Sequence, residues 1–430
     1  MISYAVEYGV MLVRKPVDVF SLMRDTAKIK VYEIIREHGP VTRAEIKHIT
    51  GMKLTTLSRI LDELSDKGLI MQTGFDVSGG GRRPVLFAIV PSFAYAVGID
   101  ISRTYTKAAL FDMALKMVDS YTMDMDESCT PQSVIERLAA WLDGTVVDKD
   151  RVLGIGIGTV GSITPDGIME HSRDFPSHGW DMVPIKQMVE TYTGLPVVVA
   201  NGADCAVMGE YSCGKAVKRS GVIAYIIIGI GIRCGIMVDG AIVSGLNEQE
   251  DAFGHMIVDI DGKLCGCGNY GCLETYCSIP AIMTSYASHI KKYRFNDDLP
   301  LSRLVFRDFC AALEKGDEIA MRVADDSAAY LAAGLANFAR LLNPQLIMLG
   351  GPLINDCHRI YDVAVEMAYK RLYGNGSVKI HIFDKGLLSN QAVCTGAAAM
   401  IINTTLYRSG ANAMRESRDN TNRLSRIKLS

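Results

Sequence analysis

The chain has 430 residues, a formal net charge of −3 and 22% charged residues, so it can hold two or three domains with real cores and is no polycation. Its longest apolar run, 221–232, covers twelve residues and includes several glycines, whereas a membrane-spanning helix needs about twenty. The N-terminus does not resemble an export signal. These features predict a cytoplasmic protein without a membrane segment, in which clustered cysteines are metal ligands first.

The pattern along the chain divides it into four segments. Residues 1–24 have no clear period and are left as an unassigned N-terminal extension. Residues 25–90 show short helices followed by a hairpin, and the first 90 residues carry 13 Lys/Arg against 10 Asp/Glu, a mildly basic unit ahead of an acidic remainder. Residues 95–407 alternate strands and helices, which is typical of α/β architecture. The polar, basic tail 408–430 is predicted to be disordered.

Two consecutive helices are predicted within residues 25–90. Thr42-x-x-Glu45 is a capping-box pattern that marks the start of the first, which ends at Gly51. The second ends at Gly68, a residue type that favours helix C-caps. The apolar residues expected to face a small core are Ile46 and Ile49 on the first helix, and Leu54, Leu57, Leu61 and Leu64 on the second.

The second helix has a polar outward face. Helices joined by a short turn containing glycine form a helix-turn-helix, whose second helix reads DNA. Its hydroxyls and cations could hydrogen-bond base edges or hold phosphates; the residues are Lys53, Thr55, Thr56 and Arg59. An ordinary three-helix bundle with a solvated polar face is the alternative.

A basic hairpin follows the second helix. The strand-like runs 69–72 and 85–89 flank three glycines and the pair Arg82-Arg83. Glycines permit close approach to a phosphate backbone, and arginines supply the charge for it. An inert glycine-rich loop would have the same composition. The helix pair and the hairpin together favour a winged helix-turn-helix that binds double-stranded DNA.

The body contains a predicted succession of buried strands and amphipathic helices. Strands are expected at 96–101, 108–111, 152–157, 196–199, 222–228, 345–349 and 379–383. Helices are expected at 132–142, 204–211, within the block 280–342, and at 357–372 and 391–406.

A cysteine-rich segment predicts a metal site. Cys265-x-Cys267-x₄-Cys272, with His255 ten residues upstream, offers three thiolates and one imidazole. This set closes a tetrahedral zinc site with no open position, so the zinc would be structural. The alternative, free thiols in a reducing compartment, suits the isolated cysteines 129, 310 and 357.

Several motifs of the body resemble one family. Two Gly-rich hairpins at 98–104 and 229–235, the turn Gly350-Gly351, and Phe253-Gly254-His255-Met256 before the cysteine segment are similar to those of the ROK family. The match covers about residues 25–406 and is closest to the family's transcription regulators of the xylose and N-acetylglucosamine repressor type. The resemblance implies a winged helix-turn-helix followed by a two-lobed actin-like ATPase fold with structural zinc.

The sequence departs from the family's kinases at the positions that carry chemistry. The resemblance places the catalytic base second in Asn201-Gly202-Ala203-Asp204, where this chain has glycine. Asp204 lies about 200° further round a helix and is expected to point elsewhere. Ser102, Arg103 and Arg233 replace glycines of the phosphate hairpins. We therefore predict no catalytic residues and no enzyme; a sugar kinase is the alternative.

The resemblance also implies an effector pocket. Asn201, His255 and Glu274 match its sugar contacts, and Asp174 is a further polar candidate, but Gly202 and Ala252 replace expected carboxylates. These losses remove hydrogen-bond acceptors for sugar hydroxyls. Either the effector is a different sugar or derivative, or the protein has no sugar effector. The overall prediction is a repressor of carbohydrate-related genes that binds DNA as a homodimer or a dimer of dimers. A scaffold without DNA contact would leave the basic hairpin unused.

Overall fold

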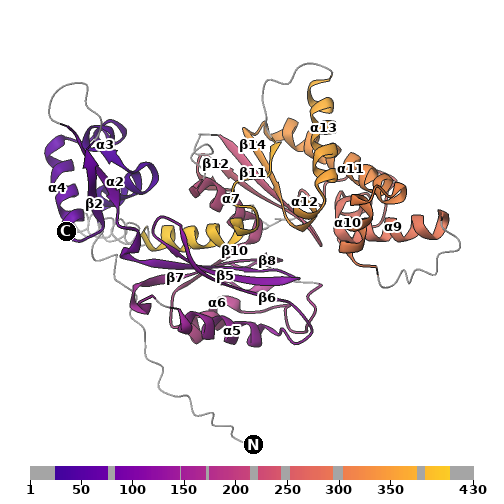
Figure 1. The fold of residues 1–430 in the computed structure, drawn as a ribbon, viewed down its shortest axis with the longest axis horizontal. Coiled ribbons are helices and arrows are strands. Elements are labelled where there is room, and N and C mark those ends of the chain that lie inside the picture. The colour runs from indigo at the N-terminus through magenta and orange to yellow at the C-terminus, as the bar shows by residue number, and fades with distance from the viewer. Residues whose placement is uncertain are drawn as a thin grey trace, which may run out of the picture. The chain divides into compact units, whose positions relative to one another are not determined.

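The computed structural model describes residues 25–75, 83–145, 147–170, 174–213, 221–243, 252–293, 304–374 and 383–406. The chain divides into two compact units (Figure 1). The first contains Met1–Thr159, Thr164–Ala200 and Ala397–Ser430, and the second contains Val160–Ile163 and Asn201–Gly396. The predicted extension 1–24 and tail 408–430 lie outside the described residues. Among the residues described, no helix is long and apolar enough to cross a membrane.

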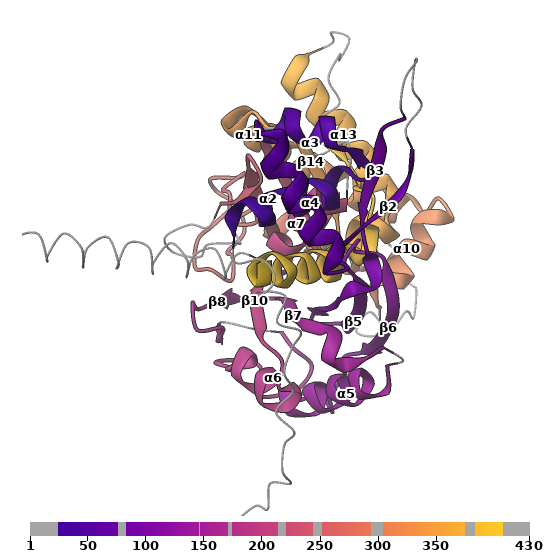
Figure 2. The same cartoon turned by 90° about the vertical axis from the view of Figure 1, so that its left-hand side faces the viewer.

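The first unit begins with helices and a small sheet (Figure 2). The helices are α2 (Thr26–His38), α3 (Arg43–Thr50) and α4 (Leu54–Asp66). The antiparallel sheet has the order β1-β3-β2, with β1 (Val41–Thr42), β2 (Ile70–Phe75) and β3 (Val85–Ile89). The hairpin strands predicted at 69–72 and 85–89 are present, the first one residue later and longer.

Local signals explain where α3 begins and ends. The hydroxyl of Thr42 accepts from the backbone N–H of Glu45, and the Glu45 carboxylate accepts from the backbone N–H of Thr42 at 2.7 Å. The predicted capping box is thus confirmed. Gly51 ends the helix with φ of 68°, a left-handed conformation that favours glycine.

Two of the predicted core residues face solvent instead. Leu54 is 50% exposed and Ile49 is also exposed, whereas Ile46 and Leu57 are fully buried. Leu54 is the first residue of α4, and it lies at the edge of the buried stripe rather than within it. The prediction that Ile49 and Leu54 belong to the core was therefore wrong.

A second sheet forms the rest of the first unit. Its order is β10-β7-β4-β5-β6, and its strands are β4 (Tyr95–Ile101), β5 (Tyr105–Asp112), β6 (Met117–Asp124), β7 (Val152–Thr159) and β10 (Val197–Asn201). Helices α5 (Pro131–Gly144) and α6 (Ile185–Thr193) cover one face, and the helical residues 392–406 continue into this unit over the other (Figures 1 and 2). The short strand β9 (Met169–Glu170) also belongs to this unit, whereas β8 (Ser162–Ile163) belongs to the second unit.

Glycines in β7 let that last helix approach the sheet. A Cβ at Gly156 would lie 1.8 Å from the carbonyl oxygen of Ala397, and one at Gly154 would lie 2.9 Å from Cγ1 of Ile401. Any larger residue at 156 would force the helix away from the strand. β7 is buried throughout, as expected for a central strand covered on both faces.

The second unit has its own five-stranded sheet among the described residues, in the order β13-β12-β11-β14-β15. The strands are β11 (Val222–Ile228), β12 (Ile232–Val238), β13 (Ala241–Ile242), β14 (Leu346–Gly350) and β15 (Phe383–Asp384). The predicted strand 379–383 meets β15 only at Phe383, because 379–382 lie outside the described residues. The predicted strand 222–228 coincides with β11.

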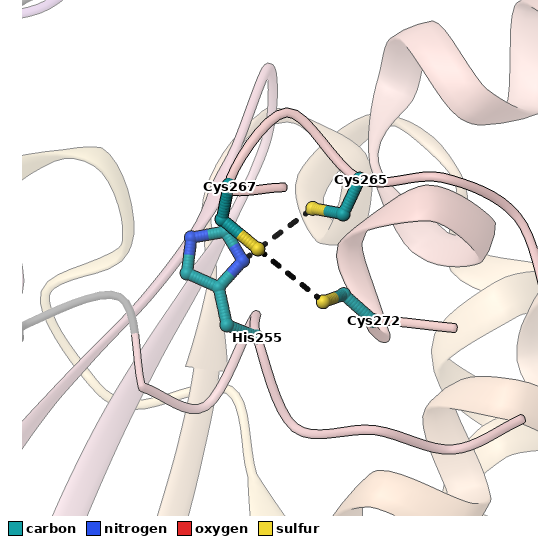
Figure 3. A group of neighbouring side chains, drawn as sticks. All are labelled: His255, Cys265, Cys267 and Cys272. Atoms are coloured by element: carbon teal, nitrogen blue, oxygen red, sulfur yellow. Dashed lines mark hydrogen bonds between the residues drawn. The ribbon is translucent and has the colours of Figure 1, made fainter. Parts of the chain in front are cut away.

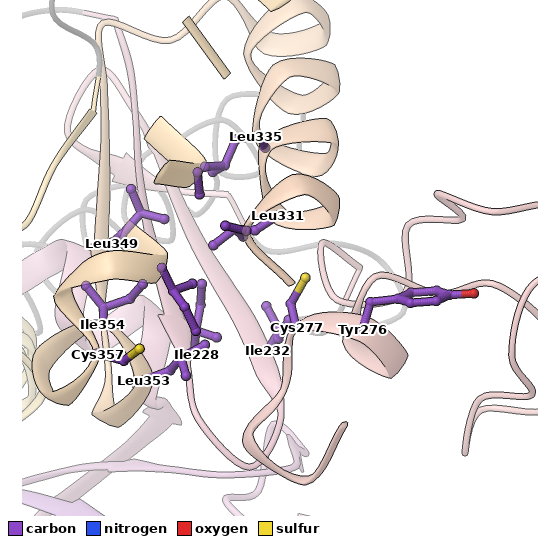
Figure 4. Packing of buried hydrophobic residues seen from close by; sticks show 14 of the residues in the cluster. Ile228, Ile232, Tyr276, Cys277, Leu331, Leu335, Leu349, Leu353, Ile354 and Cys357 are labelled. Carbon is purple, nitrogen blue, oxygen red and sulfur yellow. The ribbon is translucent and has the colours of Figure 1, made fainter. Parts of the chain in front are cut away.

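Helices pack around this sheet and complete its core. They are α7 (Gly202–Cys213), α8 (Glu274–Cys277), α9 (Ile279–Tyr293), α10 (Phe306–Glu314), α11 (Glu318–Leu342), α12 (Pro352–Asp356) and α13 (His358–Tyr373). The core cluster joins Ile228 and Ile232 of the sheet to Leu331 and Leu335 of α11 (Figure 4). This packing supports the segment 252–273, which carries the four predicted metal ligands.

Candidate functional site

The four predicted metal ligands converge in the second unit (Figure 3). The ligand atoms of His255, Cys265, Cys267 and Cys272 all lie within 4.8 Å of one another. Sγ of Cys265 is 3.6 Å from Nδ1 of His255, and the Sγ atoms of Cys267 and Cys272 are 3.6 Å apart. Ligands about 2.3 Å from a tetrahedral zinc ion are separated by about 3.8 Å. The donor set and its spacing therefore fit zinc.

Backbone hydrogen bonds fold the ligand-bearing loop back on itself. The carbonyl of Gly271 accepts from the N–H of Val258 at 2.9 Å, and the N–H of Gly271 donates to the carbonyl of Lys263 at 2.8 Å. Gly271 has φ of 73°, and a Cβ there would lie 1.6 Å from the carbonyl oxygen of Asp259. The return of the chain to its last ligand, Cys272, thus requires glycine.

Two of the three cluster thiols have raised pKa values, whereas hydrogen bonds, first that from the backbone N–H of Asn269, lower the pKa of Cys267. Burial raises the pKa of Cys272 to about 12, and burial also raises the pKa of Cys265. The thiolate is the form that coordinates zinc, so zinc binding must displace protons from these two residues. Metal affinity is therefore expected to depend on pH.

Glu274 is a predicted effector contact. It connects the metal loop, the segment 255–272 that carries the four predicted ligands, to the sheet of the second unit. Its Oε2 accepts from the backbone N–H of Ile232 at 2.8 Å, and its own N–H donates to the carbonyl of Gly254 at 2.8 Å. Ile232 begins β12, and Gly254 directly precedes His255. The carboxylate therefore holds the start of β12 beside the metal cluster.

Two further residues brace the loop and were not identified from the sequence. The hydroxyl of Tyr276 donates to Oδ2 of Asp259 at 3.0 Å and accepts from the backbone N–H of Lys263 at 3.0 Å. The Lys263 ammonium also lies 4.9 Å from the centre of the Tyr276 ring. No local sequence pattern pairs residues 259 and 276, because their contact depends on the folded loop.

The start of α7 packs closely against β12. The side-chain oxygen of Asn201, a buried residue, accepts from the N–H of Ala203 at 2.8 Å, and Gly202 is the first helical residue. A Cβ at Gly235 would lie 2.3 Å from the carbonyl oxygen of Ala203. On the same helical turn, burial raises the pKa of Asp204 to about 7. A carboxyl group tuned to neutral pH is a candidate acid or base.

Side chains close the β4–β5 turn, where the resemblance places one phosphate hairpin. Oγ of Ser102 accepts from the N–H of Tyr105 at 3.2 Å, and the Tyr105 hydroxyl donates to Oδ2 of Asp100 at 2.8 Å. Arg103 adds a large side chain to the same turn. At the other hairpin, Arg233 lies within the strand β12. Both positions carry side chains where phosphate binding favours bare backbone.

The remaining predicted effector contact belongs to the first unit. Asp174 is exposed, with φ of 66°. The following segment is anchored by Trp180, whose indole N–H donates to the carbonyl of Cys129 at 2.8 Å, and Phe175 stacks on the Trp180 ring with centroids 4.5 Å apart. The other effector candidates, Asn201, His255 and Glu274, belong to the second unit, where each makes the local contacts described above.

The predicted DNA-contacting residues of α4 are all exposed: Lys53, Thr55, Thr56 and Arg59. Nη1 of Arg59 lies 2.5 Å from Oε1 of Glu63, and Lys28 of α2 pairs with the same carboxylate. Both hydrogen bonds hold the pKa of Glu63 below its usual value. The bond from Lys28 has the largest lowering effect. Sequence reasoning missed Glu63, although its spacing of four from Arg59 is a recognised helix pairing signal.

Of the two predicted hairpin arginines, only Arg83 belongs to the described residues. Arg83 is exposed immediately ahead of β3, whereas Arg82 lies outside the described residues. Arg83 and the N-terminal turn of α4 both belong to the segment 25–89.

The chain is similar to known repressors and kinases of one family. The ROK family matches residues 96–404. The xylose repressor of Bacillus subtilis (strain 168) is 26% identical over 378 residues, 87% of this chain and 94% of the repressor. A glucokinase of Halalkalibacterium halodurans is 30% identical over 266 residues, 59% of this chain and 79% of the kinase. A crystal structure described as a ROK family transcriptional regulator, a homologue of the E. coli MLC protein, matches with a TM-score of 0.71 at 23% identity, over 91% of this chain and 98% of that one.

Proposed function

The chain belongs to the ROK family, and on that premise we propose that it is a DNA-binding transcriptional repressor of carbohydrate-related genes. The match to the xylose repressor covers 378 residues, more than the family domain 96–404 contains. The glucokinase match covers only 59% of this chain. The likeness to a protein named as a repressor therefore extends outside the kinase-like body, which supports the proposal.

The observation that carries the proposal is the exposed polar face of α4, in an arrangement of helices and hairpin that supports a winged helix-turn-helix. Helix α4 follows α3 through the turn at Gly51, and the hairpin β2–β3 follows α4. In such modules the N-terminal residues of the second helix contact base edges, and the wing contacts the sugar-phosphate backbone. The outward side chains in the N-terminal half of α4, Thr55, Thr56 and Arg59, are exposed, and the helix carries no acidic residue before Asp62.

Each predicted contact then has a distinct role. Thr55, Thr56 and Arg59 would read bases, because a guanidinium binds guanine in two hydrogen bonds and hydroxyls bind several bases. Lys53 at the N-cap, together with Arg82 and Arg83 of the wing, would neutralise phosphates. Phosphate contacts position the module, and base contacts give it sequence preference.

The kinase-like body is proposed to sense a signal rather than to transfer phosphate. Gly202 cannot accept a proton from a sugar hydroxyl, and Ser102 with Tyr105 closes the first phosphate hairpin. Phosphoryl transfer depends on positioning and charge stabilisation around the phosphates. A general base alone is worth about 10²–10⁴-fold in rate. Loss of both features supports a regulator without this activity.

A sugar kinase remains the second candidate, because one observation favours it. Burial raises the pKa of Asp204 to about 7, a value suited to a general base at neutral pH. Incubation with ATP, magnesium and a panel of hexoses and amino sugars separates the candidates. Sugar-dependent ADP formation that is lost in Asp204→Asn would establish the kinase, and absence of ADP from the wild type supports the regulator.

Zinc is proposed as a structural component of this sensing body. His255, Cys265, Cys267 and Cys272 would hold it, and the ion would supply a rigid tie for the loop they share. Glu274, two residues after the last of these ligands, accepts a hydrogen bond from the backbone N–H of Ile232 at the start of β12. Loss of the metal is therefore expected to disturb both the loop and the adjacent effector candidates.

We propose that a sugar or related ligand reaches the side chains Asn201, His255 and Glu274 of the second unit; Asp174 stays a separate polar candidate on the first unit. A regulator with no small-molecule effector is the alternative, supported by the carboxylates missing at Gly202 and Ala252. One winged module reads one half-site, so a homodimer or a dimer of dimers would bind an inverted repeat. Genome-wide occupancy measured with and without candidate sugars tests these proposals: sites with a shared inverted repeat support them, and random occupancy contradicts them.

A further inference from the structure

The proposed DNA-reading helix α4 begins with an exposed leucine. Leu54, its first residue, is 50% exposed, whereas Leu57 and Leu61 of the same helix are fully buried. A single exposed leucine is common on protein surfaces and needs no explanation by itself. Leu54 has a role beyond packing only if its neighbours form a surface that a partner binds.

Leu54 lies beyond the end of the small core on which α4 packs. Leu61 follows it two helical turns later, a spacing that brings both side chains to nearly the same side of the helix. Leu61 is fully buried and Leu54 is not, so the apolar stripe of α4 extends past the elements that cover it. Exposed residues flank Leu54 along the chain: Lys53, Thr55 and Thr56. The whole N-terminal turn of α4, with Leu54 in it, therefore faces solvent.

The charge around Leu54 indicates what kind of partner covers this turn. Residues 46–61, which include the end of α3 and the start of α4, contain no Asp or Glu. Lys47 and Lys53 lie in this segment, and both are exposed. A surface with charges of one sign attracts partners of the opposite sign and repels those of the same sign. The segment therefore suits a polyanion, such as the DNA duplex of the proposed function, better than a protein surface of mixed charge.

A DNA duplex offers a leucine one apolar partner in its major groove. The base edges there present hydrogen-bond donors and acceptors, apart from the C5-methyl group of thymine. The N-terminal residues of the second helix of a helix-turn-helix lie against these edges. A leucine that covers a donor or an acceptor leaves that group without a partner, which costs free energy. Thymine is therefore the base that a leucine at this position favours.

We propose that Leu54 is a specificity-determining residue that packs against the methyl group of one thymine in the DNA site. This inference rests on the proposed function, the binding of duplex DNA through α4, and adds a base that hydrogen bonds alone do not select. Thr55, Thr56 and Arg59 would read polar base edges, whereas Leu54 would recognise a methyl group by the exclusion of water. The apolar character that predicted a core residue serves the DNA contact instead.

Uracil substitution in the DNA tests this contact, because it removes the methyl group and leaves the hydrogen-bonding edges of the base unchanged. A binding site is first selected from random duplexes with the full-length, zinc-loaded chain. Each thymine of that site is then replaced singly by deoxyuridine, and fluorescence anisotropy gives each dissociation constant. At the thymine that faces Leu54, loss of one buried methyl group should raise the dissociation constant about fourfold.

Variants of Leu54 assign the uracil effect to its side chain. Leu54→Gln keeps a side chain of similar length but ends it in an amide, and this variant should bind the thymine and uracil sites equally. Leu54→Met stays apolar and should keep the preference for thymine. Leu341→Gln is the matched control, because Leu341 is 79% exposed on α11 in the second unit. It should show the wild-type uracil effect.

The outcomes separate this inference from the function on which it rests. If the wild-type chain prefers its selected site to a scrambled duplex, but no uracil substitution weakens binding, DNA reading stands and the role of Leu54 is wrong. A uracil effect that persists in Leu54→Gln assigns the methyl contact to another side chain and equally overturns the proposal. Failure of the wild-type chain to prefer any duplex overturns the proposed function and this inference together.

Discussion

The guanidinium of Arg59 lies 2.5 Å from the carboxylate of Glu63, one helical turn further along α4. Glu63 also pairs with Lys28 of α2, so one carboxylate both orients a proposed base-reading arginine and ties two helices together. An arginine held in one orientation loses less entropy when it binds a base than a freely rotating one. We therefore propose Glu63 as a positioning residue for the DNA contact of Arg59.

Replacing Glu63 tests this relationship. Glu63→Gln should lower the ratio of specific to non-specific DNA affinity about tenfold, because Arg59 loses its orientation and a negative charge is removed near the phosphates. Asp62→Asn removes a neighbouring exposed carboxylate and is the matched control. Fluorescence anisotropy with operator and scrambled duplexes measures both ratios. An equal effect of the two variants would contradict a specific role for Glu63.

The wing and the reading helix should respond differently to mutation. Arg83→Ala is expected to weaken binding to all duplexes alike and to reduce the slope of log affinity against log salt by about one. Arg59→Ala should instead change base preference at one position, with a loss of about 1–3 kcal/mol at the preferred base. Arg322→Ala, an exposed arginine of α11, is the control. If Arg83→Ala kept the wild-type salt dependence, the proposed contact between the wing and the DNA phosphates would be wrong.

The metal cluster predicts both stoichiometry and pH dependence. Protein prepared without chelators should contain one zinc per chain, and zinc affinity should fall as pH is lowered, because protons compete for the Cys265 and Cys272 thiols. Cys267→Ser should lose the metal and unfold about 5 °C or more below the wild type. Cys310→Ser, outside the cluster, should keep the metal. Metal analysis and thermal unfolding at pH 6 and 8 test these expectations. A zinc affinity that does not change with pH would contradict the predicted competition between protons and zinc.

Asp204 predicts a separate pH effect on stability. Burial raises its pKa to about 7 in the folded protein, above the unfolded value of 3.8. The folded state then binds more protons between these values, so this group's contribution to stability is full near pH 4 and is lost as pH rises to 7. Asp204→Asn should flatten that decline. Chemical unfolding at pH 5 and 7 measures it, and identical pH dependence in the variant would show that Asp204 is ionised throughout.

Local signals predicted the parts of the fold that depend on neighbours in sequence. The reciprocal bonds of Thr42 and Glu45, the αL conformation of Gly51 and the apolar strand β11 all follow from residues a few positions apart. Periodicity misplaced Leu54, because it counts spacing along a helix and does not show where the neighbouring elements end. Its solvent exposure depends on the packing around the first turn of α4.

In the candidate sites, too, only the residues with a local sequence signal were predicted. The four metal ligands were predicted because thiols and imidazole at short spacing have few other uses. The bond from Ile232 to Glu274 spans 42 positions, and the bond from Tyr276 to Asp259 spans 17. The pKa of Asp204 likewise depends on burial against β12. Such long-range consequences of packing have no local signature in the sequence.

Equilibrium binding of the wild-type chain to duplex DNA tests the central claim most directly. A binding site selected from random duplexes should be bound at least about 10³-fold more tightly than a scrambled duplex at physiological salt. The preference should disappear when Thr55, Thr56 and Arg59 are replaced together by alanine, while zinc content stays at one per chain. Equal affinity of the wild type for selected and scrambled duplexes would contradict the assignment of this protein as a sequence-specific repressor.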